Sequence, residues 1–390
     1  MFLFVLCIAL LSFVGLGLPE SVLGAVWPIM RGELGASLEF AGIISFIITV
    51  FKTASGLVTD RLDSRFGNGP VTAASMLVMA LSAFGCAISR SAAFICVCAV
   101  PLGAASGVID TAVNDYVSRH YKSRHMSWLH CCWGVGSVCS PFVIGIILAR
   151  GGSWRAGYRF VGIAQVVIFA ALCVSLPYWK RSSGAADDEE KVNVIPFMQA
   201  FRMKGVPCAL LAFFAYCSAE VTASLWGSSY LVEARGINAE TAATYTSLVF
   251  SGITLGRFLC SFIADRVGDR KISFIGACTA AFGALLMLLP VKAAFPALAG
   301  LLIIGLGCAP VVPSLLHATP LTFGKENTST LVGLEMASAH FGSAIMPPVF
   351  GFIAEHVSIR LFPLYVCLMM AVLVGSTLKI YRSGKADGNT

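Results

Sequence analysis

Residues 56–65 read GLVTDRLDSR and residues 261–270 read SFIADRVGDR, so an Asp-Arg pair followed by a second arginine recurs after 205 residues. A second motif, Gly-Ser-x-x-x-Pro-x-x-x-Gly, begins at Gly136 and again at Gly342. Two motifs that recur at nearly the same spacing are not expected by chance. The second half of the chain is therefore predicted to be a duplicate of the first.

Composition shows what kind of chain was duplicated. Of 390 residues, 57% are hydrophobic and 12% are charged, whereas about a quarter of a soluble domain is charged. A soluble fold of this length cannot hide so much apolar surface. Soluble enzymes, nucleic-acid-binding proteins and disordered proteins are thus excluded. Long apolar runs, each near the length of about 20 residues that crosses a bilayer, predict helices rather than barrel strands.

The predicted fold is an all-α membrane protein with twelve transmembrane helices in two six-helix bundles related by the internal repeat. The segments span approximately 2–30, 39–60, 69–90, 93–118, 126–149, 157–179, 206–232, 240–264, 272–290, 293–317, 328–354 and 360–381. We expect an N-terminal bundle over 1–180, a linker over 181–204, a C-terminal bundle over 205–382 and a tail over 383–390.

Lysine and arginine divide unevenly between the two sets of loops. Seventeen lie in the loops that include the linker and the C-terminal tail, and eight lie in the opposite loops. Because the richer side of a membrane protein is cytoplasmic, both termini and the linker are predicted to be cytoplasmic. The net charge of +7 then follows from topology and anionic lipid, with no nucleic acid required.

Fourteen cysteines lie mostly inside the apolar runs. No CxxC pair is present, so neither a zinc site nor redox chemistry is indicated. We interpret the cysteines as small packing residues and expect no metal and no cofactor.

The loop GLVTDRLDSRFG resembles the cytoplasmic signature of the major facilitator superfamily, and SFIADRVGDRK resembles its weaker second copy, with Ser261 where glycine is usual. Within that superfamily the chain resembles the fucose permease-like sugar:proton symporters. This narrower resemblance rests on LPESVLGAVWP, GVIDTAVNDYV, LHCCWGVGSVCSP and GLGCAPVVPSL. It implies two bundles that expose a site between them alternately to each side of the membrane.

Ionisable residues inside a membrane segment are costly and mark candidate functional sites. Glu20 and Glu220 have no base on the same outer half of a segment, so we expect cavity positions for them rather than structural ion pairs. Helical spacing places glycines and aromatic residues on the faces of these acids, which suits a sugar ring or an organic cation. His130 is either a proton shuttle or a hydrogen-bonded packing residue. The candidate substrate- or proton-binding residues are Glu20, Trp27, Asp110, Asn114, His130, Tyr216, Glu220, Trp226 and Tyr230.

Lys52 lies at about the same depth as two acids, Asp110 and Glu335. A pair with Asp110 would stay within one bundle, whereas a pair with Glu335 would cross between bundles. The crossing pair is slightly favoured, because segments 2 and 11 abut in the proteins that this chain resembles.

The resemblance also implies that the signature loops latch the two halves on the cytoplasmic side. The carboxylates there can accept from helix N-termini, and the arginines can bridge carboxylates and carbonyls. The predicted cytoplasmic gate consists of Lys52, Gly56, Asp60, Arg61, Arg65, Arg257, Asp265, Arg266, Arg270 and Glu335.

Neither an ATP-binding loop nor a nucleophile–base or metalloprotease motif is present, so ATP hydrolysis and intramembrane catalysis are not indicated. The sequence favours proton-coupled uptake of a sugar or similar small polar solute. The alternative is a proton-coupled drug or metabolite exporter of the same fold. The expected partners are a small-molecule substrate, the proton and membrane lipid. We expect a monomer in the bacterial inner membrane.

Overall fold

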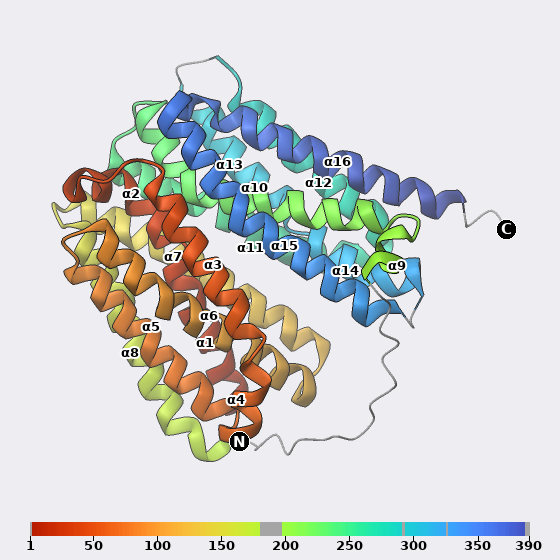
Figure 1. The fold of residues 1–390 in the computed structure, drawn as a ribbon, viewed down its shortest axis with the longest axis horizontal. Coiled ribbons are helices and arrows are strands. Elements are labelled where there is room, and N and C mark those ends of the chain that lie inside the picture. Colours follow the sequence, from red (N-terminus) through yellow and green to blue (C-terminus); the bar gives the residue numbers. More distant parts are fainter. Residues whose placement is uncertain (1, 180–196, 291–292, 325–326, 387–390) are drawn as a thin grey trace. The chain divides into compact units, whose positions relative to one another are not determined.

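The computed structural model describes residues 2–179, 197–290, 293–324 and 327–386, and its regular elements in these ranges are helices (Figure 1). Each of the twelve predicted membrane segments coincides with one helix or with two consecutive helices. The chain divides into two compact units. Unit 1 contains Met1–Ala186 and Leu231–Ser247, and unit 2 contains Asp187–Tyr230 and Leu248–Thr390. Most of the predicted linker lies outside the described residues.

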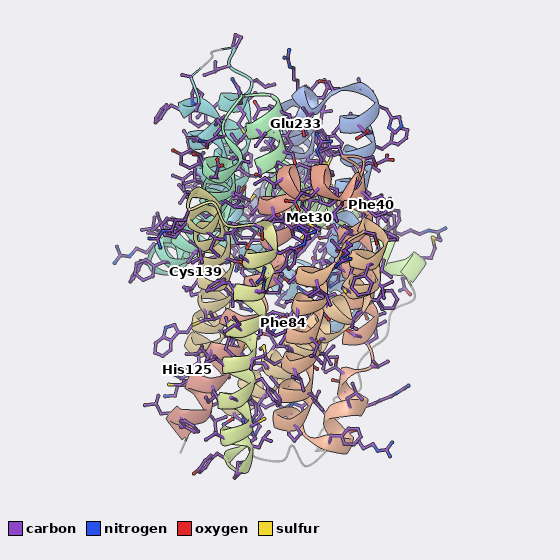
Figure 2. The ribbon with its side chains drawn as sticks, turned by 90° about the vertical axis from the view of Figure 1, so that its left-hand side faces the viewer. Met30, Phe40, Phe84, His125, Cys139 and Glu233 are labelled. Atoms are coloured by element: carbon purple, nitrogen blue, oxygen red, sulfur yellow. The ribbon has the colours of Figure 1, made fainter. Side chains whose placement is uncertain are left out.

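Unit 1 is built from the first eight helices. They are α1 (Phe2–Glu20), α2 (Val22–Leu34), α3 (Phe40–Gly56), α4 (Thr59–Phe66), α5 (Asn68–Ile88), α6 (Ala92–His120), α7 (Ser123–Ala149) and α8 (Trp154–Ser175). Within the unit α1 packs on α7, α3 on α6, and α5 on both α6 and α8. Unit 1 also takes in the end of α10, where Arg31 pairs with Glu233 at 2.8 Å. Figure 2 shows Met30 and Glu233 at this end of the unit.

Unit 2 contains the remaining helices. They are α9 (Phe197–Arg202), α10 (Val206–Glu233), α11 (Ala239–Val267), α12 (Asp269–Met287), α13 (Phe295–Cys308), α14 (Val311–Phe323), α15 (Thr328–Ile353) and α16 (Phe362–Ala386). Here α12 packs on α13, α14 and α16, and α14 packs on α15. The ends of α10 and α11 that lie in 231–247 belong to unit 1.

Nine stretches of the described residues are long and apolar enough to cross a membrane, or ten if the bent pair α3–α4 is one span. One of the nine, Thr330–Ile380, has 51 residues and contains both α15 and α16. A helix of that length would measure about 75 Å against a hydrocarbon core of about 30 Å. This stretch must therefore cross twice. Helix α11 is not among the nine, and its sequence includes the base Arg257.

Helix α4 lies outside the membrane segment that precedes it. It bends by 52° from α3, and half of its eight residues are charged. The hydrocarbon core does not accommodate such a density of charge. Asp63 of α4 corresponds in the repeat to Gly268. Gly268 has a left-handed φ of 83° and makes the turn into α12 in the second signature loop. In the first loop, Gly67 makes this turn with φ 87°, four residues after Asp63.

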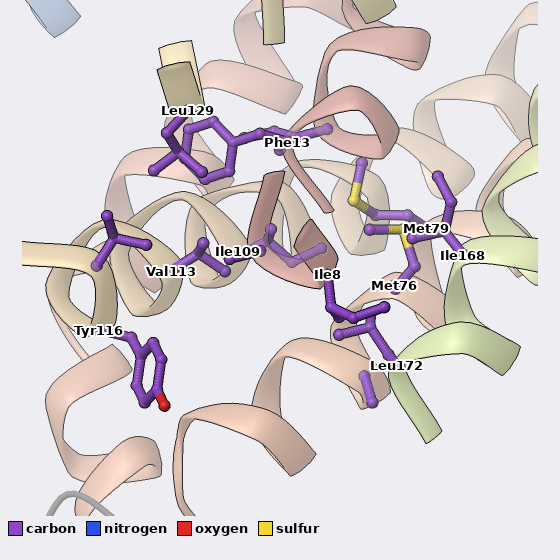
Figure 3. Packing of buried hydrophobic residues seen from close by; sticks show 14 of the residues in the cluster. Ile8, Phe13, Met76, Met79, Ile109, Val113, Tyr116, Leu129, Ile168 and Leu172 are labelled. Carbon is purple, nitrogen blue, oxygen red and sulfur yellow. The ribbon is translucent and has the colours of Figure 1, made fainter. Parts of the chain in front are cut away.

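The core of unit 1 is a cluster of buried apolar side chains drawn from five helices (Figure 3). Phe13 of α1, Met76 of α5, Ile109 of α6, Leu129 of α7 and Leu172 of α8 are each at most 1% exposed. In lipid, close van der Waals packing rather than the hydrophobic effect holds such helices together. Small residues allow that packing: a Cβ on Gly162 of α8 would lie 2.9 Å from the ring of Phe84 (Figure 2).

Candidate functional site

Three charged side chains meet inside unit 1. The Nζ atom of Lys52 on α3 lies 2.5 Å from Oε1 of Glu20, the last residue of α1. It also lies 3.7 Å from Oδ2 of Asp110 on α6. Two carboxylates therefore share one ammonium, and the closer carboxylate is that of Glu20.

Each carboxylate also has a neutral donor of its own. The indole N–H of Trp133 on α7 donates to Oε2 of Glu20 at 2.8 Å. The side-chain amide of Asn114 donates to Oδ1 of Asp110 at 2.9 Å. Both oxygens of Glu20 are thus held at hydrogen-bond distance. The second oxygen of Asp110 lies at the longer distance of 3.7 Å from Lys52.

The three side chains of the network are only partly covered by the rest of the chain. Their exposed fractions are 22% for Lys52, 24% for Glu20 and 36% for Asp110. The most exposed of the three, Asp110, is also the acid that lies farther from Lys52.

Glycines bring the four helices close enough to form the network. A Cβ on Gly107 of α6 would collide with the carbonyl oxygen of Lys52, and a Cβ on Gly17 of α1 would collide with that of Trp133. Asp110 lies three residues after Gly107 and Glu20 three residues after Gly17, so each acid shares the packed face of its helix. The glycine spacing that suggested a ligand-shaped surface is helix packing at these positions.

One prediction about the acids is wrong. Within unit 1 the structure pairs Lys52 with Glu20 and Asp110. Within unit 2 both oxygens of Glu335 on α15 accept from the hydroxyl of Thr319 on α14 at 3.0 Å, and the crossing pair between Lys52 and Glu335 stays a prediction. Glu20 has a base, although none was expected. The error arises because sequence gives the depth of a residue in its own segment but not which segment lies beside it.

Unit 2 holds a second group of ionisable residues. Both Glu220 and Arg257 lie close enough to the buried hydroxyl of Tyr216 for a charge interaction. Arg257 is the repeat equivalent of Lys52, while residues 314–316, where the repeat would place the equivalent of Asp110, are Ser-Leu-Leu and include no acid. The second carboxylate of the unit 1 network is therefore not duplicated.

Three aromatic candidates have packing roles. Trp27 and Trp226 are each 0% exposed, and their indole N–H groups donate to the backbone oxygens of Leu38 and Pro347. Tyr230 is 3% exposed and donates to the carbonyl oxygen of Met287 at 3.4 Å. A buried indole or phenol needs such a partner. The structure therefore does not support these three as ligand contacts.

His130 is exposed on α7, with its ring edge-on to that of Phe13 at 5.8 Å. This contact places the ring beside the apolar core of unit 1, to which Phe13 belongs. A proton-shuttle role for His130 stays a prediction.

The predicted gate residues of the first signature loop lie around α4. Asp60, Arg61 and Arg65 are exposed, and a Cβ on Gly56 would lie 3.2 Å from the hydroxyl of Thr111. The guanidinium of Arg65 lies 5.3 Å from the ring centroid of Phe66.

In the second loop Arg266 is exposed, and Arg270 donates to the hydroxyl of Thr322 at 3.0 Å. The side chain of Asp265 lies outside the described residues. A gating role for either loop stays a prediction.

Two polar residues of unit 1 were not predicted from the sequence. Trp133 lies within the motif LHCCWGVGSVCSP of the fifth predicted segment. Nothing in the sequence shows that its indole reaches α1. Asp63 is a buried acid at 7% exposure that accepts from the amide of Asn68 at 2.8 Å. Burial and the neighbouring charges of Asp115 and Asp60, partly offset by Arg119, raise the pKa of Asp63 to about 7.

The sequence of the chain is similar to those of known membrane transporters. The family model described as Major Facilitator Superfamily matches residues 5–249 and 208–387. The glucose/mannose transporter GlcP of Bacillus subtilis is 24% identical over 81% of this chain and 79% of its own. The cis,cis-muconate transport protein of Acinetobacter baylyi is 23% identical over 85% of this chain and 83% of its own.

Among solved structures, that of the nucleoside transporter NupG superposes with a TM-score of 0.78 at 12% identity, covering 96% of this chain and 98% of that one. This likeness supports the fold alone. Because the family model covers nearly the whole chain, the protein belongs to the Major Facilitator Superfamily and is a membrane transporter rather than an enzyme.

Proposed function

We propose that the protein is a proton-coupled secondary transporter that takes up a sugar or similar small polar solute by alternating access. The observation that carries this proposal is the network in which Glu20 and Asp110 share Lys52. With both acids ionised the three side chains carry a net charge of about −1, and one proton makes the network neutral. Such a group can link proton binding to a rearrangement of helices.

Asp110 is the acid to which we assign the exchangeable proton. Its contact to Lys52 is 3.7 Å, against 2.5 Å for Glu20, and its side chain is the more exposed. A proton on Asp110 removes the weaker contact and leaves the Glu20–Lys52 pair intact.

The charge of the network bears on the substrate. Lys52 is already engaged by two carboxylates, so little of its charge is available to an acidic solute. This favours a neutral polar solute, of the kind in the name of the glucose/mannose relative, over an acid such as cis,cis-muconate. Asn114 and Trp133, which border the network, supply amide and aromatic surface for such a solute.

The orientation and location of the protein belong to the same proposal. The bias of lysine and arginine supports cytoplasmic termini and a cytoplasmic α4 in the bacterial inner membrane. We retain the division into two six-helix bundles joined by the linker 181–204, and a monomeric transporter.

The test uses purified protein in proteoliposomes with an imposed pH gradient and a panel of labelled sugars. Wild-type protein should concentrate one of them when the outside is acidic. Asp110→Asn should lose uphill accumulation but keep exchange of substrate across the membrane. Glu335→Gln is the matched control, since that acid accepts a hydrogen bond from Thr319 within unit 2. Uphill accumulation by Asp110→Asn equal to that of the wild type would contradict the assignment.

A further inference from the structure

A cavity of about 340 Å³ lies in unit 2 between the start of α10 and the last turns of α16. Pockets of this size hold small ligands or parts of larger ones. Its six lining residues are Lys204, Gly205, Cys208, Lys379, Ile380 and Arg382. Three of the six are bases and none is an acid.

The bases come from two places in the unit. Lys379 and Arg382 are three residues apart on α16, so their side chains lie on one face of that helix. Lys204 precedes Gly205, whose φ of 94° makes the turn from α9 into α10. The cavity therefore collects positive charge from both of its walls.

The bases also lie where apolar helix gives way to polar chain. The apolar run of α16 ends just before Lys379, and that of α10 begins just after Gly205. Figure 1 shows α9 and the last turns of α16 at the same end of unit 2. Lysine and arginine at such helix ends reach the level of the lipid headgroups. The partly exposed side chain of Cys208 adds apolar surface to the same cavity, whose wall Ile380 completes from a buried position.

We propose that this cavity binds the headgroup of an anionic phospholipid. The planar guanidinium of Arg382 can donate two parallel hydrogen bonds to a phosphate, and the two lysines add point charges around it. The alkyl stems of the lysines and the partly exposed side chain of Cys208 suit the glycerol and first acyl carbons, which a free phosphate lacks. The binding site is separate from the Glu20–Lys52–Asp110 network in unit 1 and does not depend on its function.

The experiment titrates detergent-solubilised full-length protein with short-chain phosphatidylglycerol, phosphatidylcholine of equal chain length, or inorganic phosphate. Lipid binding is counted by native mass spectrometry, and thermal unfolding is followed in parallel. Phosphatidylglycerol should bind and stabilise at concentrations where the other two do neither. Each base near a membrane surface contributes about 1 kcal/mol, so Lys379→Gln/Arg382→Gln should weaken that binding by about 30-fold.

The control variant Lys122→Gln/Lys271→Gln removes two exposed charges outside the cavity and should bind phosphatidylglycerol as the wild type does. If the double variant does not fold, Lys204→Gln alone should weaken binding by about 5-fold. Equal stabilisation by inorganic phosphate would overturn the lipid assignment. Equal loss in the control variant, or unchanged binding by the cavity variant, would show that only overall charge matters and overturn the site.

Discussion

Replacing Lys52 by methionine tests which acid this lysine serves. The change keeps a side chain of similar length and leaves Glu20 and Asp110 facing one another without their shared base. At an effective dielectric constant of about 20, the attraction across 2.5 Å is about 7 kcal/mol and that across 3.7 Å about 4 kcal/mol. Desolvation offsets most of both, so the net loss on removing the base is about 3 kcal/mol.

A second substitution then shows how that loss divides between the acids. On the Lys52→Met background, Glu20→Gln should recover about 1.5–3 kcal/mol, because Glu20 makes the direct charge-assisted hydrogen bond. Asp110→Asn should recover less than about 1 kcal/mol, because its contact exceeds hydrogen-bond length. Glu335→Gln should recover nothing, because that acid binds Thr319.

The assay is the free energy of unfolding in mixed micelles for the wild type, the four single variants and the three double variants, with the coupling energy taken from each cycle. Uptake measured on the same preparations separates stability from transport. A coupling of Lys52 to Glu335 as large as that to Glu20 would refute the arrangement in unit 1. Equal coupling to Glu20 and Asp110 would refute the ranking of the two acids.

Three further predictions follow from other contacts. Trp133→Phe removes the N–H that binds Glu20 at 2.8 Å but keeps an aromatic ring, so it should destabilise the protein by about 1–2 kcal/mol in a denaturation assay; Trp128→Phe on the same helix, whose side chain is 49% exposed, is the control, and equal destabilisation by both variants would contradict it. Asp63 has a folded-state pKa of about 7 against an ordinary value of 3.8, so stability should fall as pH rises from about 4 through 7, by up to about 4 kcal/mol. Asp63→Asn should remove this fall in melting temperature between pH 5 and 8, and a variant that still shows it would exclude Asp63 as its source. Gly107→Ala places a Cβ against the backbone of α3 and should destabilise by about 1–3 kcal/mol, whereas Gly333→Ala, which meets nothing within 4 Å, should be neutral or slightly stabilising in the same denaturation assay.

The candidate site was predicted in part. Glu20, Lys52, Asp110 and Asn114 were all recognised as polar residues inside membrane segments, and the structure joins the four in one network. Such residues stand out because an isolated charge in lipid is costly wherever the segment packs. Trp133, which completes the network, was not recognised, because an indole in an apolar segment is unremarkable until its acceptor is known.

The sequence by itself determined the properties that depend on one segment at a time. Apolar length, the 205-residue repeat and the uneven lysine and arginine content predicted a duplicated bundle of membrane helices, because each rests on hydropathy or on order along the chain. Only the tertiary structure decided that Lys52 binds Glu20 more closely than Asp110, and that Trp27 and Trp226 bond to backbone oxygens inside the packed helices. The reason is physical: helical periodicity sets the depth and face of a side chain, but its partner depends on which helices abut. Here those neighbours are set by glycines such as Gly17 and Gly107, whose missing Cβ atoms let particular backbones touch.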